Sequence, residues 1–110
     1  MNDCLFCRIV VRDAPADIEY EDDAVLAFRD IYPKAPVHVL IIPKRHIVSV
    51  QDLELVDAEL IGRCFVAARR IGEMTGFGER GYRVTVNCGP EGGQVVSHVH
   101  FHFLAGRRGP

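Results

Sequence analysis

The sequence predicts an α+β fold, in which an antiparallel sheet of about five strands carries one long and one short helix. Short runs of alternating or continuous apolar residues indicate strands, and acidic or glycine- and proline-rich turns separate them. Between Leu55 and Thr75 apolar residues recur every three or four positions, which is typical of an amphipathic helix, and Gly76 suits its C-cap. We expect the helices on one face of the sheet.

The other elements follow in chain order. Residues 3–11 indicate a short helix that Asp3 could cap. The expected strands are Ile18–Glu21 and Ala24–Arg29, which form a hairpin, then Val37–Ile42, Gly81–Asn87 and Ser97–Leu104. The apolar stripe of the long helix consists of Leu60, Ile61, Cys64, Phe65, Ala68 and Ile71.

Length and composition restrict the kind of protein. A chain of 110 residues with 48% hydrophobic residues suits a single domain over residues 1–110. The formal net charge of −2 provides no basic surface for nucleic acid. No apolar run reaches the ~20 residues that cross a bilayer, and no secretory signal opens the sequence. We therefore expect a cytoplasmic protein that binds neither nucleic acid nor membranes.

The last expected strand carries three histidines that alternate with apolar residues. Side chains alternate across a strand, so His98, His100 and His102 would share one face, roughly 7 Å apart. Such a row could bind a metal, act as a nucleophile and proton carrier near neutral pH, or be an inert solvated face. The unbroken alternation argues against the inert alternative.

Four cysteines stand in a chain for which we expect reducing surroundings, so a disulfide framework is not expected. Cys4 and Cys7 form a C-x-x-C pair that, with His46 and His98, would complete a closed Cys₂His₂ zinc set. The alternative is that both are free thiols. Cys64 falls on the apolar stripe and is interpreted as a core residue.

Two polar stretches have an ordinary interpretation, and the first of them also has a functional one. Gly92-Gly93 could form only a tight turn, but it leads directly toward the histidines, where its backbone amides could hold a phosphate. Lys44 and Arg45 precede His46 and are interpreted as solvated surface charges.

The stretch His98-Val-His-Phe-His-Phe-Leu104 resembles the motif of the histidine triad (HIT) superfamily at every position. The resemblance extends over nearly the whole chain and is nearest to the histidine triad nucleotide-binding (Hint) branch, in its bacterial type with an N-terminal C-x-x-C. It rests on segments in matching order, which are Glu21-Asp22-Asp23, Ala27–Ile31, Ala35-Pro36, Ile42–His46, Gly81-Tyr82-Arg83 and Gly92-Gly93-Gln94.

The resemblance implies a hydrolase that binds purine nucleotides and cleaves at the α-phosphorus, releasing a nucleoside monophosphate. His100 would be the nucleophile that carries a covalent nucleotidyl group. His102 would contact the phosphate and assist proton transfer to the leaving group, and His98 would support the site from behind. Cys4, Cys7, His46 and His98 would hold a structural zinc, and no organic cofactor is implied.

The resemblance also implies a nucleotide site. Asp30 would accept hydrogen bonds from the ribose, and Asn87 with the backbone around Gly93 and Val95 would hold the phosphate. Val95 stands where many members have serine, so a backbone amide remains there without the hydroxyl. The base would lie among apolar residues, namely Leu5, Phe6, Ile9, Phe28 and Ile31; for Leu5 and Ile9 a core role fits equally well.

Three functions remain open from the sequence. The first is hydrolysis of purine nucleoside phosphoramidates, and the second is hydrolysis of dinucleoside polyphosphates by the same histidines. The third is a nucleotide-binding or scaffold protein without significant turnover. A homodimer through the long helix and a strand edge is implied in each case.

Overall fold

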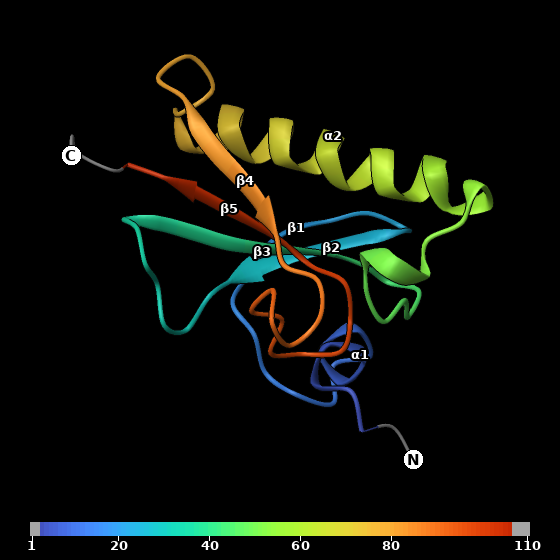
Figure 1. Ribbon diagram of the computed structural model, residues 1–110. Coiled ribbons are helices and arrows are strands. Elements are labelled where there is room, and N and C mark those ends of the chain that lie inside the picture. Colours follow the sequence, from blue (N-terminus) through green and yellow to red (C-terminus); the bar gives the residue numbers. More distant parts are fainter. Residues whose placement is uncertain (1–2, 107–110) are drawn as a thin grey trace.

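The structure, a computed structural model, describes residues 3–106 and confirms the predicted fold class. In those residues two helices and five strands follow one another (Figure 1). They are α1 (Leu5–Val10), β1 (Ile18–Glu21), β2 (Val25–Arg29), β3 (Val37–Pro43), α2 (Ala58–Thr75), β4 (Tyr82–Val86) and β5 (Phe101–Ala105).

The strands form one antiparallel sheet in the order β1-β2-β3-β5-β4. The strand with the histidine motif therefore lies between β3 and β4, inside the sheet. Val39 pairs with Phe103 and Leu40 with His102, so the last histidine is held by neighbours on both sides. A strand paired on both sides is rigid, which suits side chains that need fixed positions.

The two helices cover opposite faces of the sheet, so the expectation that they share a face is wrong (Figure 1). In β2, Val25 and Ala27 belong to the core under α2, while Leu26 and Phe28 pack with α1. All four of these residues are buried. A strand that is apolar on both faces needs cover on both sides, and α1 provides the second cover.

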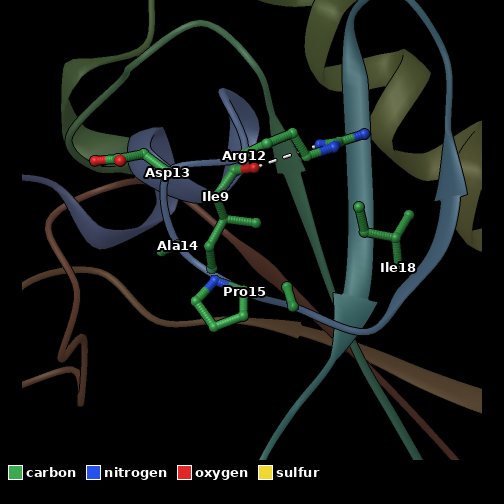
Figure 2. Close-up of a pocket in the computed structure, with 7 residues that line it drawn as sticks. Ile9, Arg12, Asp13, Ala14, Pro15 and Ile18 are labelled. Carbon is green, nitrogen blue, oxygen red and sulfur yellow. Dashed lines mark hydrogen bonds between the residues drawn. The ribbon is translucent and has the colours of Figure 1, made fainter.

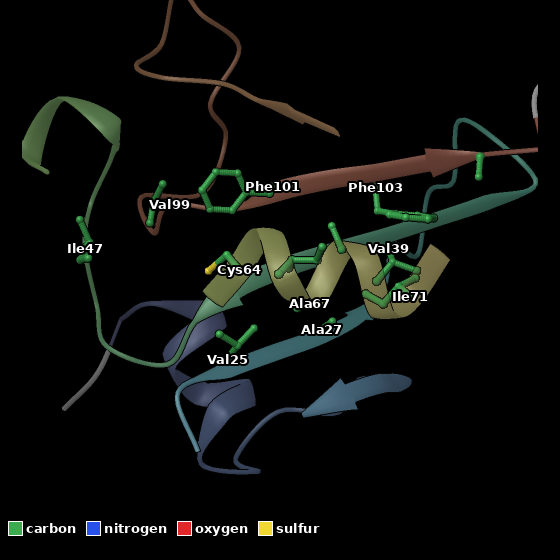
Figure 3. Close-up of a cluster of buried hydrophobic side chains, with 13 residues drawn as sticks. Val25, Ala27, Val39, Ile47, Cys64, Ala67, Ile71, Val99, Phe101 and Phe103 are labelled. Atoms are coloured by element: carbon green, nitrogen blue, oxygen red, sulfur yellow. The ribbon is translucent and has the colours of Figure 1, made fainter. Parts of the chain in front are cut away.

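The main core lies between the sheet and α2 (Figure 3). It contains Val99, Phe101 and Phe103, the apolar partners of the histidines, as the alternation predicts. From α2 it receives Cys64, Ala67, Ala68 and Ile71. Phe65 is 51% exposed, although its ring centroid lies 5.3 Å from that of Phe101, so its assignment to the buried stripe is wrong.

The long helix begins at Ala58, three residues after the expected start. Leu55–Asp57 forms a separate 3₁₀ turn, in which the Asp57 carboxylate accepts a hydrogen bond from the Glu54 amide at 2.9 Å. Leu55 is 94% exposed, so it does not continue the apolar stripe. The helix ends as predicted, with Gly76 in the left-handed conformation at φ 82°.

The histidine strand begins at Phe101 rather than at Ser97. The amide of Val99 donates to the carbonyl of Ile47 at 2.7 Å, and the amide of His98 donates to Val96 at 2.9 Å. These backbone groups are therefore taken by loops and not by a strand ladder. His98 and His100 precede the strand, although both are buried on the side away from the main core.

We predict that Phe103→Ala lowers the free energy of unfolding by about 3–5 kcal/mol, because the ring is fully buried and its loss leaves a cavity. Leu55→Ala, at an exposed position, should change it by less than about 0.5 kcal/mol. Urea denaturation followed by circular dichroism measures both. Equal stability of the two variants would show that the main core does not depend on this strand.

Candidate active site and metal centre

His100 is buried just before the start of β5, and its surroundings determine which ring nitrogen reacts. Its Nδ1 lies 2.7 Å from the carbonyl oxygen of His98. A carbonyl only accepts, so Nδ1 carries the proton and Nε2 keeps its lone pair. The Phe6 ring stands edge-on to the imidazole at 5.1 Å. Burial lowers the pKa of His100 below its ordinary value, so the ring is neutral near pH 7.

His102 is half-buried in β5, and its ring centroid lies 5.1 Å from that of His100. Its Nδ1 lies 2.9 Å from Nε2 of His38, a buried histidine on β3. From the sequence, His38 was expected only as part of a strand. A signal existed, because His38, Leu40 and Ile42 alternate on one strand face, and antiparallel pairing could bring that face beside His102.

Asp30 lies close to this histidine pair. One carboxylate oxygen accepts a hydrogen bond from the amide of Tyr32 at 2.8 Å. The other lies 3.4 Å from Nε2 of His38. The structure therefore brings Asp30 beside His38 and His102.

The glycine-rich connection forms a compact turn that is fastened by polar side chains. The side-chain amide of Asn87 donates to the Gly92 carbonyl at 2.7 Å. Gln94 accepts from the Gly89 amide at 2.9 Å and donates to the Val48 carbonyl at 2.6 Å. A Cβ on Gly92 would lie 2.2 Å from the carbonyl oxygen of Cys88, so glycine is required there. Gln94 was not among the expected site residues, although it stands in the quoted motif.

The five apolar residues expected around the base divide into two groups. Phe6, Ile9 and Phe28 are buried in a small core against the sheet, with the Phe6 and Phe28 rings 5.3 Å apart. Leu5 and Ile31 are exposed. The core role that was left open for Ile9 is therefore present, whereas Leu5 is accessible to a ligand.

Ile9 also lines a surface hollow of about 410 Å³ after α1 (Figure 2). The other lining residues are Arg12, Asp13, Ala14, Pro15, Ala16 and Ile18. The lining includes no histidine, so this hollow is separate from the imidazole face. A larger hollow of about 630 Å³ brings Cys4, Cys7 and His46 together with Val95 and Val96, and so lies between the cysteines and the end of the glycine turn.

Cys4, Cys7, His46 and His98 come together and could hold a metal ion. Their candidate ligand atoms all lie within 4.8 Å of one another. Nδ1 of His46 lies 3.2 Å from Nδ1 of His98 and 3.2 Å from Sγ of Cys7, while Sγ of Cys4 lies 3.3 Å from Nδ1 of His98. In a tetrahedral zinc site two imidazole nitrogens are about 3.3 Å apart and nitrogen and sulfur about 3.6 Å, so the donor set fits.

The surroundings of the four residues also suit a metal. Nε2 of the fully buried His98 lies 2.8 Å from the Pro43 carbonyl, so Nε2 carries the proton and Nδ1 is left to face the cluster. Cys4, not Asp3, caps α1, since the helix begins at Leu5 and the Cys4 sulfur accepts from the Cys7 amide at 3.4 Å. The cluster therefore joins the start of α1 to the histidine segment.

Two other sequence interpretations are resolved. Lys44 pairs with Glu21 at 2.7 Å and Arg45 pairs with Asp57, so these cations form ion pairs rather than standing as purely solvated charges. Cys64 is buried in the main core, and burial raises the pKa of its thiol to about 12. It is a packing residue, as predicted.

Within residues 3–106, no helix has both the length and the apolar character to cross a membrane.

Comparison with known proteins identifies the family. The HIT domain model matches residues 11–109. The purine nucleoside phosphoramidase of Escherichia coli (strain K12) is 45% identical over 106 residues, which is 96% of this chain and 89% of that protein. An uncharacterized HIT-like protein of Synechococcus elongatus is 46% identical over 106 residues, which is 96% of this chain and 92% of that protein.

A solved structure, a HIT family hydrolase from Clostridium thermocellum, has the same fold. It superposes with a TM-score of 0.95 at 45% sequence identity, covering 100% of this chain and 96% of that one. With the family model, the close relatives and the shared fold in agreement, the chain belongs to the HIT domain family.

Proposed function

We propose that residues 1–110 form one HIT domain that hydrolyses purine nucleoside phosphoramidates at the α-phosphorus and releases a nucleoside monophosphate. The observation that carries the proposal is the state of His100, a neutral imidazole whose Nδ1 proton is held by a carbonyl and whose Nε2 lone pair is available. The activity named for the Escherichia coli relative supports the choice of substrate.

The proposed reaction has two displacements at phosphorus. Nε2 of His100 attacks the α-phosphorus, the phosphorus–nitrogen bond breaks, and the amine leaves after gaining a proton. Water then attacks the nucleotidyl-imidazole, the phosphorus–nitrogen bond to His100 breaks, and the nucleoside monophosphate is released with the free imidazole. His98 supports the nucleophile, because its carbonyl oxygen orients the His100 ring.

The nucleotide is proposed to lie across the imidazole face. Asp30 would bind the ribose hydroxyls, and Asn87 with the backbone of Gly93 and Val95 would hold the phosphate near His100 and His102. The φ of 91° at Gly93 and the fastened turn support this, because such backbone can direct amides at an anion. The base would contact Leu5, Phe6, Ile9, Phe28 and Ile31.

Zinc is the proposed metal at the Cys₂His₂ cluster. Two thiolates and two imidazoles close all four positions, which is typical of a structural site. The ion would fix α1 against the segment that carries His98. It would contribute folding free energy and take no part in the displacement.

We further propose a cytoplasmic homodimer. A reducing cytoplasm would keep the side chains of Cys4 and Cys7 as thiols that can bind the metal. β4 is an edge strand, and Phe65, Val66 and Val86 are exposed apolar residues on α2 and β4. Edge strands and apolar patches of this kind are commonly covered by a second copy.

We predict that His100→Ala abolishes hydrolysis of a fluorogenic adenosine phosphoramidate but leaves AMP binding measurable by calorimetry. Rapid quenching of the wild-type reaction followed by peptide mass spectrometry should find the adenylyl group on His100. Undiminished turnover in the variant would refute the mechanism. Higher kcat/KM for a diadenosine polyphosphate would favour the second hydrolytic function, and AMP binding without turnover of either substrate would favour the scaffold function.

Metal analysis should find about one zinc per chain, with Zn–S distances of about 2.3 Å by X-ray absorption. The double variant Cys4→Ser/Cys7→Ser should lose the metal and unfold at a lower temperature. Cys88→Ser, which changes a cysteine outside the cluster, is the matched control and should keep it. Full zinc content in the double variant would place the metal elsewhere.

Light scattering after gel filtration should give a mass of about twice the 12.3 kDa chain. Val66→Asp combined with Val86→Asp should produce the monomer, because a carboxylate in an apolar interface loses its hydration. Val11→Asp, at an exposed position after α1, should leave the dimer intact. A monomeric wild-type protein would disprove the proposed assembly.

A further inference from the structure

Three positively charged side chains, those of Lys34, Arg80 and Arg83, form no ion pair within the described residues 3–106. The chain has 13 lysines and arginines, and 11 remain once Arg107 and Arg108, which lie outside the described residues, are set aside. The other eight each lie beside a carboxylate. The three exceptions therefore carry charges that no carboxylate of the described residues compensates.

All three of these residues line one surface hollow of about 310 Å³, at the place where β5 ends and β4 begins. They come from separate segments, because Lys34 lies in the loop between β2 and β3, Arg80 follows α2, and Arg83 belongs to β4. No residue that lines the hollow is acidic. The fold thus gathers these three charges in one place, although the formal net charge of the chain is −2.

The walls of the hollow hold one cation in place and leave room beside it. The guanidinium of Arg80 lies 4.5 Å from the centroid of the Phe77 ring. A guanidinium that rests on an aromatic face keeps its N–H groups free around its edge, where they can donate to an anion. Small residues, namely Ala35, Gly81 and Gly106, form part of the remaining lining. The hollow therefore offers both space and a positioned donor.

We propose that the hollow around Lys34, Arg80 and Arg83 binds a small molecule that carries two or more linked phosphate groups. An arginine binds phosphate oxygens through a fork of two N–H groups, and a lysine adds a point charge. A ligand with a single charge would leave two of the cations uncompensated. Linked phosphates place several negative oxygens within a short length, so that one ligand can reach all three side chains.

The hollow adjoins the imidazole face but is separate from it. Leu104 lines the hollow and lies two residues beyond the last histidine of the motif, roughly 7 Å along the strand. The backbone amide of Lys34 donates to Nδ1 of His38 at 3.0 Å, so the loop that carries this lysine touches both places. Neither His100 nor Asp30 lines the hollow. The proposed site can therefore be filled while a nucleotide occupies the imidazole face, and it does not depend on the proposed function.

A carboxylate of a second copy is the competing occupant, because β4 is the edge strand that is proposed to meet a partner. The sequence of β4, Tyr82–Val86, contains no acidic residue. Pairing of this strand with the same strand of a second copy would therefore bring no carboxylate from β4 to Arg83. The Glu73 carboxylate, near the end of α2, already pairs with Arg69 at 3.0 Å. These observations favour a separate anionic ligand over the partner subunit.

The direct test is calorimetric titration of the full-length protein with tripolyphosphate, in saturating AMP and without divalent cations. One tripolyphosphate should bind per chain, and raising the salt concentration from about 50 to about 500 mM should weaken binding by about 10-fold or more. Arg80→Ser and Arg83→Ser should each raise the Kd by about 10-fold, because each removes a charged donor. Arg8→Ser is the matched control and should change the Kd by less than about twofold, since Arg8 pairs with Asp13 on α1, away from this end of the sheet (Figure 1).

NMR locates the site and identifies the kind of ligand. With tripolyphosphate in saturating AMP, the backbone amide signals of Gly81 and Gly106 should shift, while that of Gly93 in the glycine turn should not. Tighter binding of tripolyphosphate than of ATP would indicate a free oligophosphate, and tighter binding of ATP would indicate the phosphate chain of a nucleotide. Citrate should bind at least about 10-fold more weakly than either, since its carboxylates carry less charge on each group. Equal binding of citrate would overturn the choice of phosphate.

Further variants separate an anion site from an interface. Lys34→Ser should weaken tripolyphosphate binding while the Tm and the mass in solution stay as in the wild type. The proposal is overturned if tripolyphosphate does not bind, if its NMR shifts centre on Gly93, or if AMP displaces it. It is also overturned if Lys34→Ser and Arg80→Ser lower the mass of the assembly, because a partner carboxylate would then fill the hollow. Inactivity of the wild-type protein on phosphoramidates would instead refute only the proposed function, which these binding experiments do not require.

Discussion

The alternation of side chains along the last strand and the residues before it is the constraint on which the rest of the structure depends. Val99, Phe101 and Phe103 are held in the main core under α2, and this fixes the backbone between them. The intervening imidazoles must then project to the opposite side. The core residues therefore position the reactive ones, because a side chain can be no more fixed than the backbone that carries it.

Three histidines of one motif have three different states because each meets a different partner. The proton of His98 is bound by the Pro43 carbonyl, which leaves Nδ1 directed toward the cysteines. The proton of His100 is bound by the His98 carbonyl, which leaves Nε2 as a lone pair. Nδ1 of His102 accepts a hydrogen bond from Nε2–H of His38, so His102 keeps its own Nε2–H as a donor. Ligand, nucleophile and donor thus follow from the acceptors and donors around identical side chains.

The short helix α1 connects the two sites. Phe6 packs against Phe28 in the small core and stands edge-on to the His98 and His100 rings. Cys4 and Cys7, at the start of the same helix, meet His46 and His98. One helix of six residues is too short to be stable alone, so its position depends on these contacts. A bound ion would therefore influence the imidazole face through packing, without touching the substrate.

Local sequence determined the elements, because periodicity and turn residues act over a few neighbours. The alternating histidines, the long amphipathic helix and the glycine turn were all predicted. So was the grouping of Cys4, Cys7, His46 and His98, where the residue types themselves suggested a common ion. The short helix was wrongly placed on the α2 face, although the continuous apolar run in β2, which needs cover on both faces, carried the signal. The extent of the histidine strand was also wrong, because its amides are claimed by Ile47 and Val96 from distant or irregular segments.

Only the tertiary structure decided which nitrogen of each ring carries its proton. That state depends on groups far away in sequence, such as the Pro43 carbonyl for His98 and His38 for His102. Antiparallel pairing of β3 with β5 brings His38 beside the motif, and the alternation within Val37–Pro43 gives only the strand face on which His38 lies, not the partner that it meets. The sequence by itself therefore determined which side chains could do chemistry, and long-range hydrogen bonding decided what each can do, since a proton is placed by the nearest acceptor in space.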